Sequence, residues 1–470
     1  MKETVERELK LSPGEGFVMP ELGGEPLPPR TFVSTYHDTP DLVLARHGVT
    51  FRHRVEDGAG LWQLKLPKGG ATRIELELAG PPARPPEEML ALVVAFLRGR
   101  PVVPVARLRT RREGFRAEGA EIVHDSVAVM VGTQIARRFG EVEIELLEGD
   151  ERTLRRFEQE LRRAGADSTD TLRPKLFRAL DLADPPAVVE VPSGSLPSVA
   201  LGIALGEQVR RLLVHDPGTR LGSDAEDLHQ LRVTTRRLRA FLRAGRSLLD
   251  RAWADDLRTE LGWLGRELGP ARDLDVLVER LEHELAELGS DAEGGTGLLV
   301  ELEAERATAR RAVVEALSSE QYLALLDRLD HVHDPELSGD EPPLVDVWRS
   351  EWKKTRKAFS KLDETSADDD LHAARIRVKR ARYAAELAAH ELGKRGKAFV
   401  EAAKELQDVL GIHQDATVAE ERIRSWAAGA SDGGVAAGRL VQLERARKSD
   451  ARAAWPAAWR SLHRAAKKLA

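Results

Sequence analysis

The chain opens with charged residues that alternate with mostly apolar ones. Read as a β-strand, the segment VERELKLSPG (residues 5–14) places Glu6, Glu8 and Lys10 on one face, each about 7 Å from the next. Water could simply solvate such a face. Alternatively, the face could hold a metal cation and an anion together, because carboxylates bind hard cations and ammonium groups bind phosphate oxygens.

Further charged faces follow within the first 180 residues. One of them is most simply a solvated surface, but five or six are harder to explain in that way, since glutamates in register repel one another. Carboxylates clustered beside arginines and lysines suit a divalent cation, Mg²⁺ or Mn²⁺, together with a polyanion. Both explanations remain open from these residues alone. The residues concerned are Arg52, Arg54, Lys65, Arg73, Glu75, Arg107, Arg109, Arg111, Glu141, Glu143 and Glu145.

The pattern of apolar residues divides the chain into an N-terminal sheet and a C-terminal helical region. Short alternating segments, interrupted by Gly, Pro and Asp, predict an antiparallel sheet for residues 1–180. Within it, 86–99 and 150–165 have helical patterns instead. A segment rich in Pro and Ser, 181–198, predicts a linker. From 199 to 470 the apolar period becomes 3.6 residues, which predicts an all-helical domain.

The helical region contains an internal repeat. LHQLRVTTRRLRAFL (228–242) matches LHAARIRVKRARYAA (371–385) at an offset of 143 residues, and LGPARDLDVL matches LGIHQDATVA at an offset of 142. Two separate matches at nearly one offset indicate a duplication. We therefore expect two pseudo-symmetric helical bundles, at 199–330 and 345–470.

Each repeat carries a row of basic residues along one helical face. In the first repeat they recur at i, i+3, i+7, i+10 and i+14, which spans about 21 Å of helix. Basic rows are usually solvated and paired with acidic residues one turn away, but such partners are scarce here. The rows therefore predict binding of a linear polyanion; nucleic acid is not the expected one, because few aromatic residues could stack on bases. The rows are His229, Arg232, Arg236, Arg239 and Arg243, and His372, Arg375, Lys379 and Arg382.

The composition limits the classes of function. The 470 residues include no cysteine, which excludes disulfides and thiolate chemistry, and no apolar run is long enough to span a membrane. The first ten residues, MKETVERELK, lack the apolar core of a signal peptide. We expect a cytoplasmic protein with no membrane partner.

The N-terminal motifs resemble those of a known family. Glu6-x-Glu8-x-Lys10 is similar to the ExExK signature of the CYTH family, the triphosphate tunnel metalloenzymes. The likeness continues through YHDTPD (36–41), FRHR, QLKLP and PKLFRAL (174–180), so it covers residues 1–180. The resemblance implies an eight-stranded antiparallel β-tunnel whose charged face points inward, in an α+β multidomain protein.

The resemblance also implies roles for individual residues. Mg²⁺ or Mn²⁺ would activate a water that attacks the terminal phosphorus of inorganic triphosphate or a nucleoside triphosphate. Glu6 or Glu8 would accept the proton of that water, and Lys10 would contact phosphate. The implied metal ligands are Glu6, Glu8, Glu141 and Glu143, with Glu145, Glu75 and Asp125 as further ligands or as balancing charges. The implied triphosphate-binding residues are Lys10, Arg52, Arg54, Lys65, Arg73, Arg109, Arg111 and Lys175.

The C-terminal repeat resembles a second family. The paired H-x-x-R rows and the L-G-x-x-x-D segments are similar to those of the CHAD domain, a helical domain with conserved histidines. This resemblance implies that inorganic polyphosphate binds in a basic pore between two four-helix halves. The second copy carries Lys379 and Gln414 where the first has Arg236 and Arg272, so we expect weaker binding by its half.

Three functions agree with these features. The first is a metal-dependent triphosphatase with a polyphosphate-binding helical domain. The second is a protein that binds polyphosphate without turnover, in association with polyphosphate granules. The third is an adenylate cyclase of the same fold, which would need an adenine pocket that the sequence does not locate.

Overall fold

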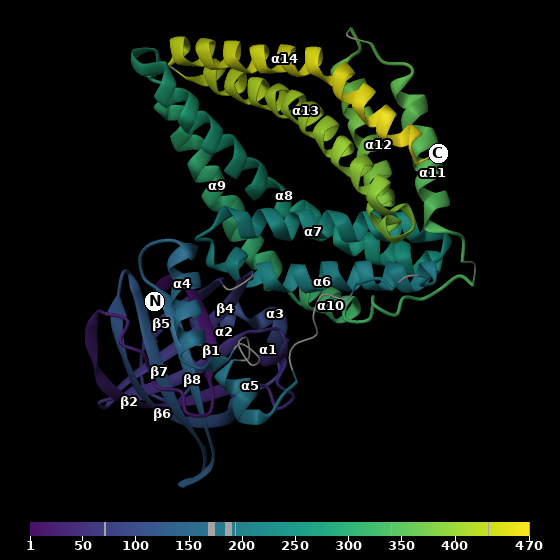
Figure 1. Cartoon of the computed structure of the whole chain (residues 1–470). Coiled ribbons are helices and arrows are strands. Elements are labelled where there is room, and N and C mark those ends of the chain that lie inside the picture. Colours follow the sequence, from purple (N-terminus) through teal and green to yellow (C-terminus); the bar gives the residue numbers. More distant parts are fainter. Residues whose placement is uncertain are drawn as a thin grey trace. The chain divides into compact units, whose positions relative to one another are not determined.

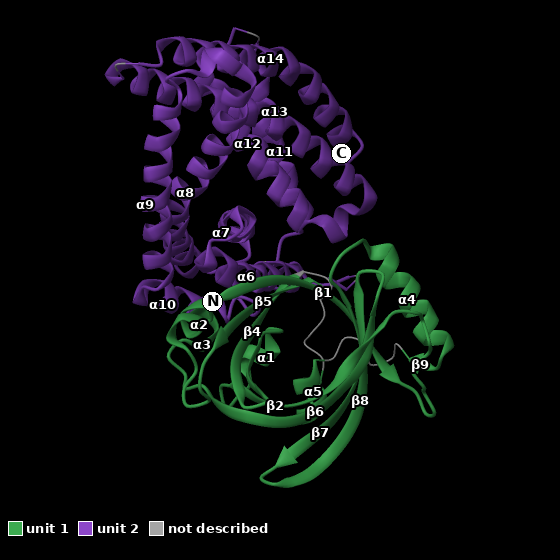
Figure 2. Cartoon of the chain, turned by 90° about the vertical axis from the view of Figure 1, so that its left-hand side faces the viewer, with its two compact units in different colours: residues 1–187 green, residues 188–470 purple. Residues whose placement is uncertain are grey.

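A computed structural model describes residues 1–69, 72–167, 174–183, 190–192, 194–339, 341–363, 365–430 and 432–469. The chain divides into two compact units, residues 1–187 and 188–470 (Figures 1 and 2). The division falls within the segment 181–198 that we propose as a linker, part of which lies outside the described residues.

The first unit is a closed antiparallel barrel. Its strands pair in the order β5-β4-β3-β2-β6-β7-β8-β1, and β1 pairs with β5 to close the ring, which Figure 2 shows end-on. The short strand β9 (Ala166–Asp167) pairs with the end of β1. The predicted eight-stranded antiparallel tunnel is confirmed. Its strands are β1 (Lys2–Pro13), β2 (Glu25–Asp38), β3 (Thr50–Glu56), β4 (Ala59–Gly69), β5 (Thr72–Ala79), β6 (Val103–Ala117), β7 (Ala120–Val131) and β8 (Gln134–Leu146).

Strand alternation places apolar residues on the outer face of the barrel beneath helix α4 and charged residues on its inner face. On β1, Leu9 and Leu11 point outward and pack against Phe157 of helix α4 (Glu151–Arg163), so Glu6 and Glu8 point inward. The predicted helix at 86–99 consists of two short helices, α2 (Glu87–Leu92) and α3 (Val94–Leu97). The break lies at Val93, whose non-helical backbone (ψ 14°) separates them.

One end of the barrel interior is filled by apolar side chains. Helix α5 (Lys175–Leu180) inserts Leu176 and Phe177 among the inward-facing Tyr36, Leu108 and Val127. The adjacent short helix α1 (Val43–Arg46) adds Ala45 to the same cluster. Charged residues are therefore confined to the rest of the interior, and the first residue of α5, Lys175, faces them.

The second unit is helical, as predicted. Helices α6 to α9 belong to the first repeat and α11 to α14 to the second (Figure 1). A non-helical residue, Gly393, interrupts α13 near its start. The helices are α6 (Pro197–Leu221), α7 (Ala225–Ala244), α8 (Arg251–Leu288), α9 (Thr296–Leu317), α10 (Glu320–Leu329), α11 (Leu344–Phe359), α12 (Asp368–Leu387), α13 (Ala389–Gly429) and α14 (Gly434–Lys467).

The two repeats are packed together at two places. Helices α7 and α12, each of 20 residues, cross with the rings of Phe241 and Tyr383 edge-on, 6.3 Å apart. Elsewhere, Leu281 of α8 and Leu302 of α9 share a buried apolar cluster with Leu440 of α14. These contacts fix the position of α7 relative to α12, which carry the two basic rows.

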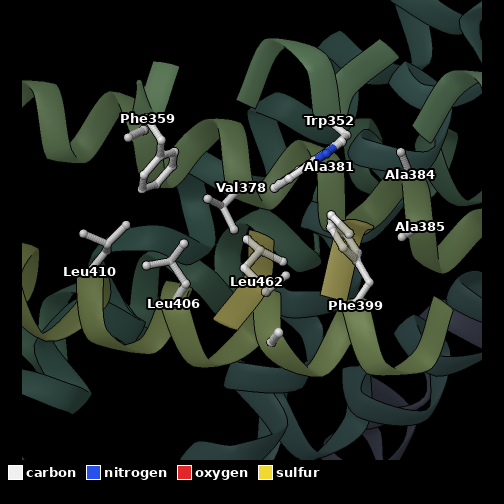
Figure 3. Packing of buried hydrophobic residues seen from close by; sticks show 14 of the residues in the cluster. Trp352, Phe359, Val378, Ala381, Ala384, Ala385, Phe399, Leu406, Leu410 and Leu462 are labelled. Carbon is white, nitrogen blue, oxygen red and sulfur yellow. The ribbon is translucent and has the colours of Figure 1, made fainter. Parts of the chain in front are cut away.

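The core of the second repeat is aromatic. Figure 3 shows Phe399 of α13 packed beside Trp352 of α11, and its ring also contacts Trp348; the centroids lie 5.5 and 5.4 Å apart. Small residues of α12, such as Ala381 and Ala385, allow the helices to approach closely.

Replacing Phe399 with alanine should lower the free energy of unfolding of the helical unit by about 3–5 kcal/mol, because a buried ring is removed and a cavity remains. Urea denaturation followed by tryptophan fluorescence would measure the change. Val300→Ala is the control, since this side chain is 71% exposed and its loss should change stability by less than about 0.5 kcal/mol. Equal effects of the two substitutions would contradict the described core.

Candidate functional site

The interior of the barrel contains a cavity of about 450 Å³ with charged walls. Most residues predicted from the sequence line it together, although they come from β1, β3, β4, β5, β8 and α5. The predicted residues that line the cavity are Glu6, Glu8, Lys10, Arg52, Arg54, Lys65, Arg73, Glu75, Glu143, Glu145 and Lys175.

Two arginines predicted for this site lie elsewhere. Arg109 and Arg111 are exposed, neither lines the cavity, and Arg111 pairs with Glu113 at 2.5 Å. They do share a face of β6 with Arg107, but it is the outer face, because the even-numbered Thr110 and Arg112 point inward. The prediction that Arg109 and Arg111 face the tunnel is therefore wrong.

Arg112 is the inward-facing arginine of β6 that sequence reasoning missed. Its guanidinium donates to Asp125 at 2.7 and 2.8 Å and also to Glu143. Arg30, Tyr36 and Gln63 line the cavity as well and were not predicted. A sequence signal existed only indirectly: Asp125 is opposite Arg112 in the β6–β7 register, so the pair could be found once the register was known.

Carboxylates and lysines pair at the inner end of the cavity, next to α5. Lys10 Nζ lies 2.6 Å from Glu143 and 3.3 Å from Glu141, which is only 1% exposed and lies behind the cavity wall. Lys175 Nζ lies 2.7 Å from Glu143, 3.0 Å from Glu141 and 2.8 Å from Asp125. Burial would raise the pKa of Glu143, but Lys10, Lys175 and Arg112 together hold it well below its usual value.

Glu6 lies in a more negative environment. Its carboxylate accepts from Lys65 at 2.6 Å, yet burial and the neighbouring Glu75 raise its pKa to about 7. Burial and the charge of Glu6 also raise the pKa of Glu145. Glu8 differs: burial opposes its ionisation, but Lys10 and Lys65 lower its pKa to about 2. Glu6 and Glu145 are therefore harder to ionise than Glu8, because burial and neighbouring carboxylates act on them together.

Cations collect on β3 and the neighbouring strands. Arg52 donates to Gln63 at 2.9 Å and to the Tyr36 hydroxyl at 3.3 Å. Arg54 lies over the ring of Phe32, 3.8 Å from its centroid, and pairs with Glu56. Burial, and then the charge of Arg52, lower the pKa of Arg54, so an anion bound in the cavity would relieve this repulsion.

The donor set of the cavity fits a hard divalent cation. Its acidic oxygens are those that Mg²⁺ and Mn²⁺ prefer, and a bound cation would oppose the effect of burial and of neighbouring carboxylates, which raise the pKa of Glu6 and Glu145. Within the described ranges, however, no three acidic or histidine side chains converge as a ready metal site, because the ammonium groups of Lys10 and Lys65 stand between them. The carboxylates that would hold the cation are Glu6, Glu8, Glu143 and Glu145.

The predicted histidines of the helical unit have equivalent environments in the two repeats. His229 Nδ1 accepts from Arg272 Nε at 3.0 Å, and His372 Nδ1 lies 2.9 Å from Gln414 Oε1. Gln414 occupies the position of Arg272 in the repeat alignment. In both repeats, therefore, the histidine of the H-x-x-R motif contacts the L-G-x-x-x-D motif of the same repeat.

The arginines three residues after these histidines contact the next helix of their own repeat, α8 or α13. Arg232 donates to Gly269 O at 3.2 Å and pairs with Asp273 at 2.6 Å, and Arg375 donates to Gln407 O at 3.3 Å. A Cβ at Gly411 would lie 2.9 Å from the Arg375 guanidinium, so a side chain there would displace this group.

Basic side chains from both repeats face one another where α7 crosses α12. Burial, followed by the charges of Arg375 and Arg236, lowers the pKa of Lys379 to about 7. Burial and the charges of Arg232, Arg375 and Arg382 likewise lower the pKa of Arg236. We call these five residues the crossing cluster: Arg232, Arg236, Arg375, Lys379 and Arg382. Arg239 and Arg243 continue the row along α7 beyond it.

Comparison with known proteins identifies both units. The family model of the CYTH domain matches residues 2–173, and that of the CHAD domain matches residues 203–424. Uncharacterized protein MT2285 of Mycobacterium tuberculosis is 33% identical over 515 residues, covering 99% of this chain and 97% of the relative. The chain belongs to the CYTH family and carries a CHAD domain. The CYTH domain places the first unit among the triphosphate tunnel metalloenzymes and supports a phosphoryl-transfer enzyme.

Solved structures similar to this CYTH–CHAD protein include PptA from Streptomyces chartreusis and the CHAD domain from Ricinus communis. PptA is 23% identical with a TM-score of 0.48, and the match covers 57% of this chain and all of PptA. The plant domain is 26% identical with a TM-score of 0.49, and the match covers 59% of this chain and 95% of the domain. In the described part of the CYTH–CHAD chain, no helix has the length and apolar character needed to cross a bilayer.

Replacing Lys175 with methionine should destabilise the CYTH unit by about 3–5 kcal/mol, because Asp125, Glu141 and Glu143 would stay buried without their shared cation. Hydrogen exchange of barrel peptides, read by mass spectrometry, would measure this. Arg111→Met also removes one positive charge, but from the exposed outer face, and should leave exchange unchanged. Unchanged exchange in the Lys175 variant would show that the lysine does not hold these carboxylates.

Proposed function

We propose that the CYTH unit is a metal-dependent triphosphatase that hydrolyses inorganic triphosphate or a nucleoside triphosphate, and that the CHAD unit binds inorganic polyphosphate. The observation that carries the first part is the division of charge within one cavity. Glu6 and Glu75 share one cation, Lys65, at 2.6 and 3.6 Å, while Arg52 and Arg54 line the same cavity and the charge of Arg52 adds to burial in lowering the pKa of Arg54. A divalent cation and a triphosphate would each satisfy one of these surfaces.

Substrate binding would use the arginines and lysines of the cavity. Arg52 and Arg54 would hold phosphate oxygens through paired N–H groups, at positions where burial strengthens the interaction. Lys10 and Lys65 now neutralise carboxylates, and in the substrate complex their ammonium groups would also contact phosphate.

Hydrolysis requires a positioned water and stabilisation of the charge that develops on the phosphate. When bound, Mg²⁺ or Mn²⁺ would lower the pKa of a water and neutralise part of that charge. Glu6 and Glu8 line the cavity, and a carboxylate oxygen of one of them would accept the water's proton. The arginine N–H groups, fixed by Tyr36, Gln63 and Phe32, would stabilise the equatorial oxygens of the transferred phosphoryl group.

Arg54→Gln should reduce kcat/KM for tripolyphosphate at least tenfold, or about 1.4 kcal/mol, because a charge-assisted contact to the triphosphate is lost. Phosphate release with Mg²⁺ and with Mn²⁺ would be measured. Arg111→Gln, on the outer face, should retain wild-type activity. Equal activity of the two variants would contradict this role of Arg54.

Product analysis distinguishes the proposed functions of the CYTH unit. Release of inorganic phosphate from tripolyphosphate or ATP supports hydrolysis, whereas pyrophosphate and a cyclic nucleotide from ATP would indicate a cyclase. Binding of tripolyphosphate without any product would indicate a site that does not turn over. Glu6→Gln should abolish phosphate release, because it removes one charged ligand and one proton acceptor.

Polyphosphate binding by the CHAD unit is supported by the crossing cluster. Five basic side chains meet there. Two of them have an acidic partner, since Arg232 pairs with Asp273 and Arg382 pairs with Glu386. A polyanion would restore the proton of Lys379, whose pKa is about 7 without ligand.

Polyphosphate binding at pH 8 should therefore be accompanied by uptake of up to about one proton, and uptake should vanish below about pH 6, where Lys379 is already charged. Calorimetry in buffers of different ionisation enthalpy measures this number. Lys379→Arg should bind polyphosphate without proton uptake, because arginine stays charged. Equal uptake by this variant and the wild type would place the proton elsewhere.

A further inference from the structure

A second basic cavity lies beside the crossing cluster, between α7 and α8 of the first repeat. Its volume is about 460 Å³, and its lining contains four arginines and one acidic residue. We call the four the first-repeat arginines: Arg239, Arg246, Arg258 and Arg266. The three from beyond α7 have no place in the basic rows seen in the sequence.

In this cavity the Arg239 guanidinium lies against Gly262 and Gly265 of α8. A Cβ at Gly262 would lie 3.5 Å from the Arg239 guanidinium, and one at Gly265 would lie 3.8 Å from it. Arg232 rests in the same manner against Gly269, two helical turns further along α8. Successive arginines of the α7 row thus lie over glycines of α8.

Positive charge in the cavity is only partly balanced. Arg246 and Arg258 share a single carboxylate, Asp255, at 2.6 and 2.7 Å. Burial, and then the charges of Arg258 and Arg266, lower the pKa of Arg239. The cavity therefore favours an anion, and Asp255 and the surface of α8 already position Arg246, Arg258 and Arg239 in it.

The second repeat lacks this arrangement. At the same repeat offsets, Arg246, Arg258 and Arg266 are replaced by Ala389, Val400 and Asp408, and Gly262 by Lys404; Arg243 of the row is replaced by Glu386. Arg382, the counterpart of Arg239, pairs with Glu386 at 3.3 Å instead. The cavity on that side, of about 530 Å³, is balanced by Glu207, Glu386 and Glu401 against Arg237, Lys397 and Lys404.

We propose that a polyphosphate chain held at the crossing cluster continues over the first repeat only, into the cavity of the first-repeat arginines. This inference rests on the proposed binding of polyphosphate by the CHAD unit. Arg236 of the crossing cluster and Arg239 of the cavity are three residues apart on one face of α7, so a flexible chain of phosphates can contact both. Binding is then one-sided, although the fold is duplicated.

The chemistry of the cavity favours inorganic polyphosphate over nucleic acid. Its lining offers guanidinium groups, a threonine, a glycine and one carboxylate, but no aromatic ring on which a base could stack. Inorganic polyphosphate needs only charge and hydrogen-bond donors along its length.

The test compares two double variants that remove the same charge from opposite sides. Arg246→Gln with Arg266→Gln removes two exposed first-repeat arginines, and Lys397→Gln with Lys404→Gln removes one exposed and one half-buried lysine of the balanced cavity lined by α13. Affinity of the full chain for long polyphosphate would be measured at several salt concentrations, with a chelator to prevent turnover. The arginine variant should lose about tenfold or more in affinity and show a salt slope smaller by about two, while the lysine variant matches the wild type.

A third variant separates this inference from the function on which it rests. Arg236→Gln with Lys379→Gln should abolish the binding of polyphosphate. If the wild type itself does not bind polyphosphate, the proposed function fails. If only this crossing variant loses affinity, or if the arginine and lysine variants lose it equally, one-sided binding is overturned. An oligonucleotide of equal phosphate number that binds as tightly would overturn the assignment to inorganic polyphosphate.

Chemical modification provides a readout that does not depend on variants. Polyphosphate should protect Arg258 and Arg266 of the wild-type chain from phenylglyoxal, and should leave Arg395 of the second repeat as reactive as before. Equal reactivity of Arg258 with and without polyphosphate would contradict the proposal.

Discussion

The CYTH unit depends on one constraint: each buried charge must be paired with a charge of opposite sign. A carboxylate placed in the barrel without a cation would lose several kcal/mol of solvation, so each buried acid needs a partner at bonding distance. Glu143 has three, Lys10, Lys175 and Arg112, and they come from β1, α5 and β6. These ion pairs therefore connect helix α5, which fills one end of the barrel, to the strands. The charge balance of the site is a condition of folding as well as of binding.

The CHAD unit has the opposite imbalance, because the basic side chains of the crossing cluster outnumber their acidic partners. Repulsion at the crossing cluster is tolerated since the helices are fixed elsewhere by apolar contacts, such as Phe241 against Tyr383 and the cluster that contains Leu281 and Leu440. The packing holds the arginines at a spacing that they would not adopt alone. An anionic ligand then gains attraction without first having to order these side chains.

The strands and their inward charges followed from alternation in three segments, 5–11 of β1, 73–78 of β5 and 141–146 of β8, where acidic and apolar residues have opposite parity. On β6 the segment RLRTRR has arginines of both parities, at 111 and 112, so the pattern could not show which one faces inward. The answer depends on pairing with Asp125 across β7, which is a tertiary fact. The break of the predicted helix at Val93 was hidden for a similar reason, because both short helices bury apolar residues.

The repeat was visible in the sequence, but its consequence at the centre was not. A pseudo-two-fold brings equivalent positions together, so Arg236 of α7 lies close to its own counterpart, Lys379 of α12. Two arginines there would both remain charged in the empty site. A lysine in one copy can release its proton when the site is empty and regain it when an anion binds. Divergence at this position thus reduces repulsion in the free protein. Divergence at the positions of the first-repeat arginines distinguishes the two halves, which an exact duplication would leave equivalent.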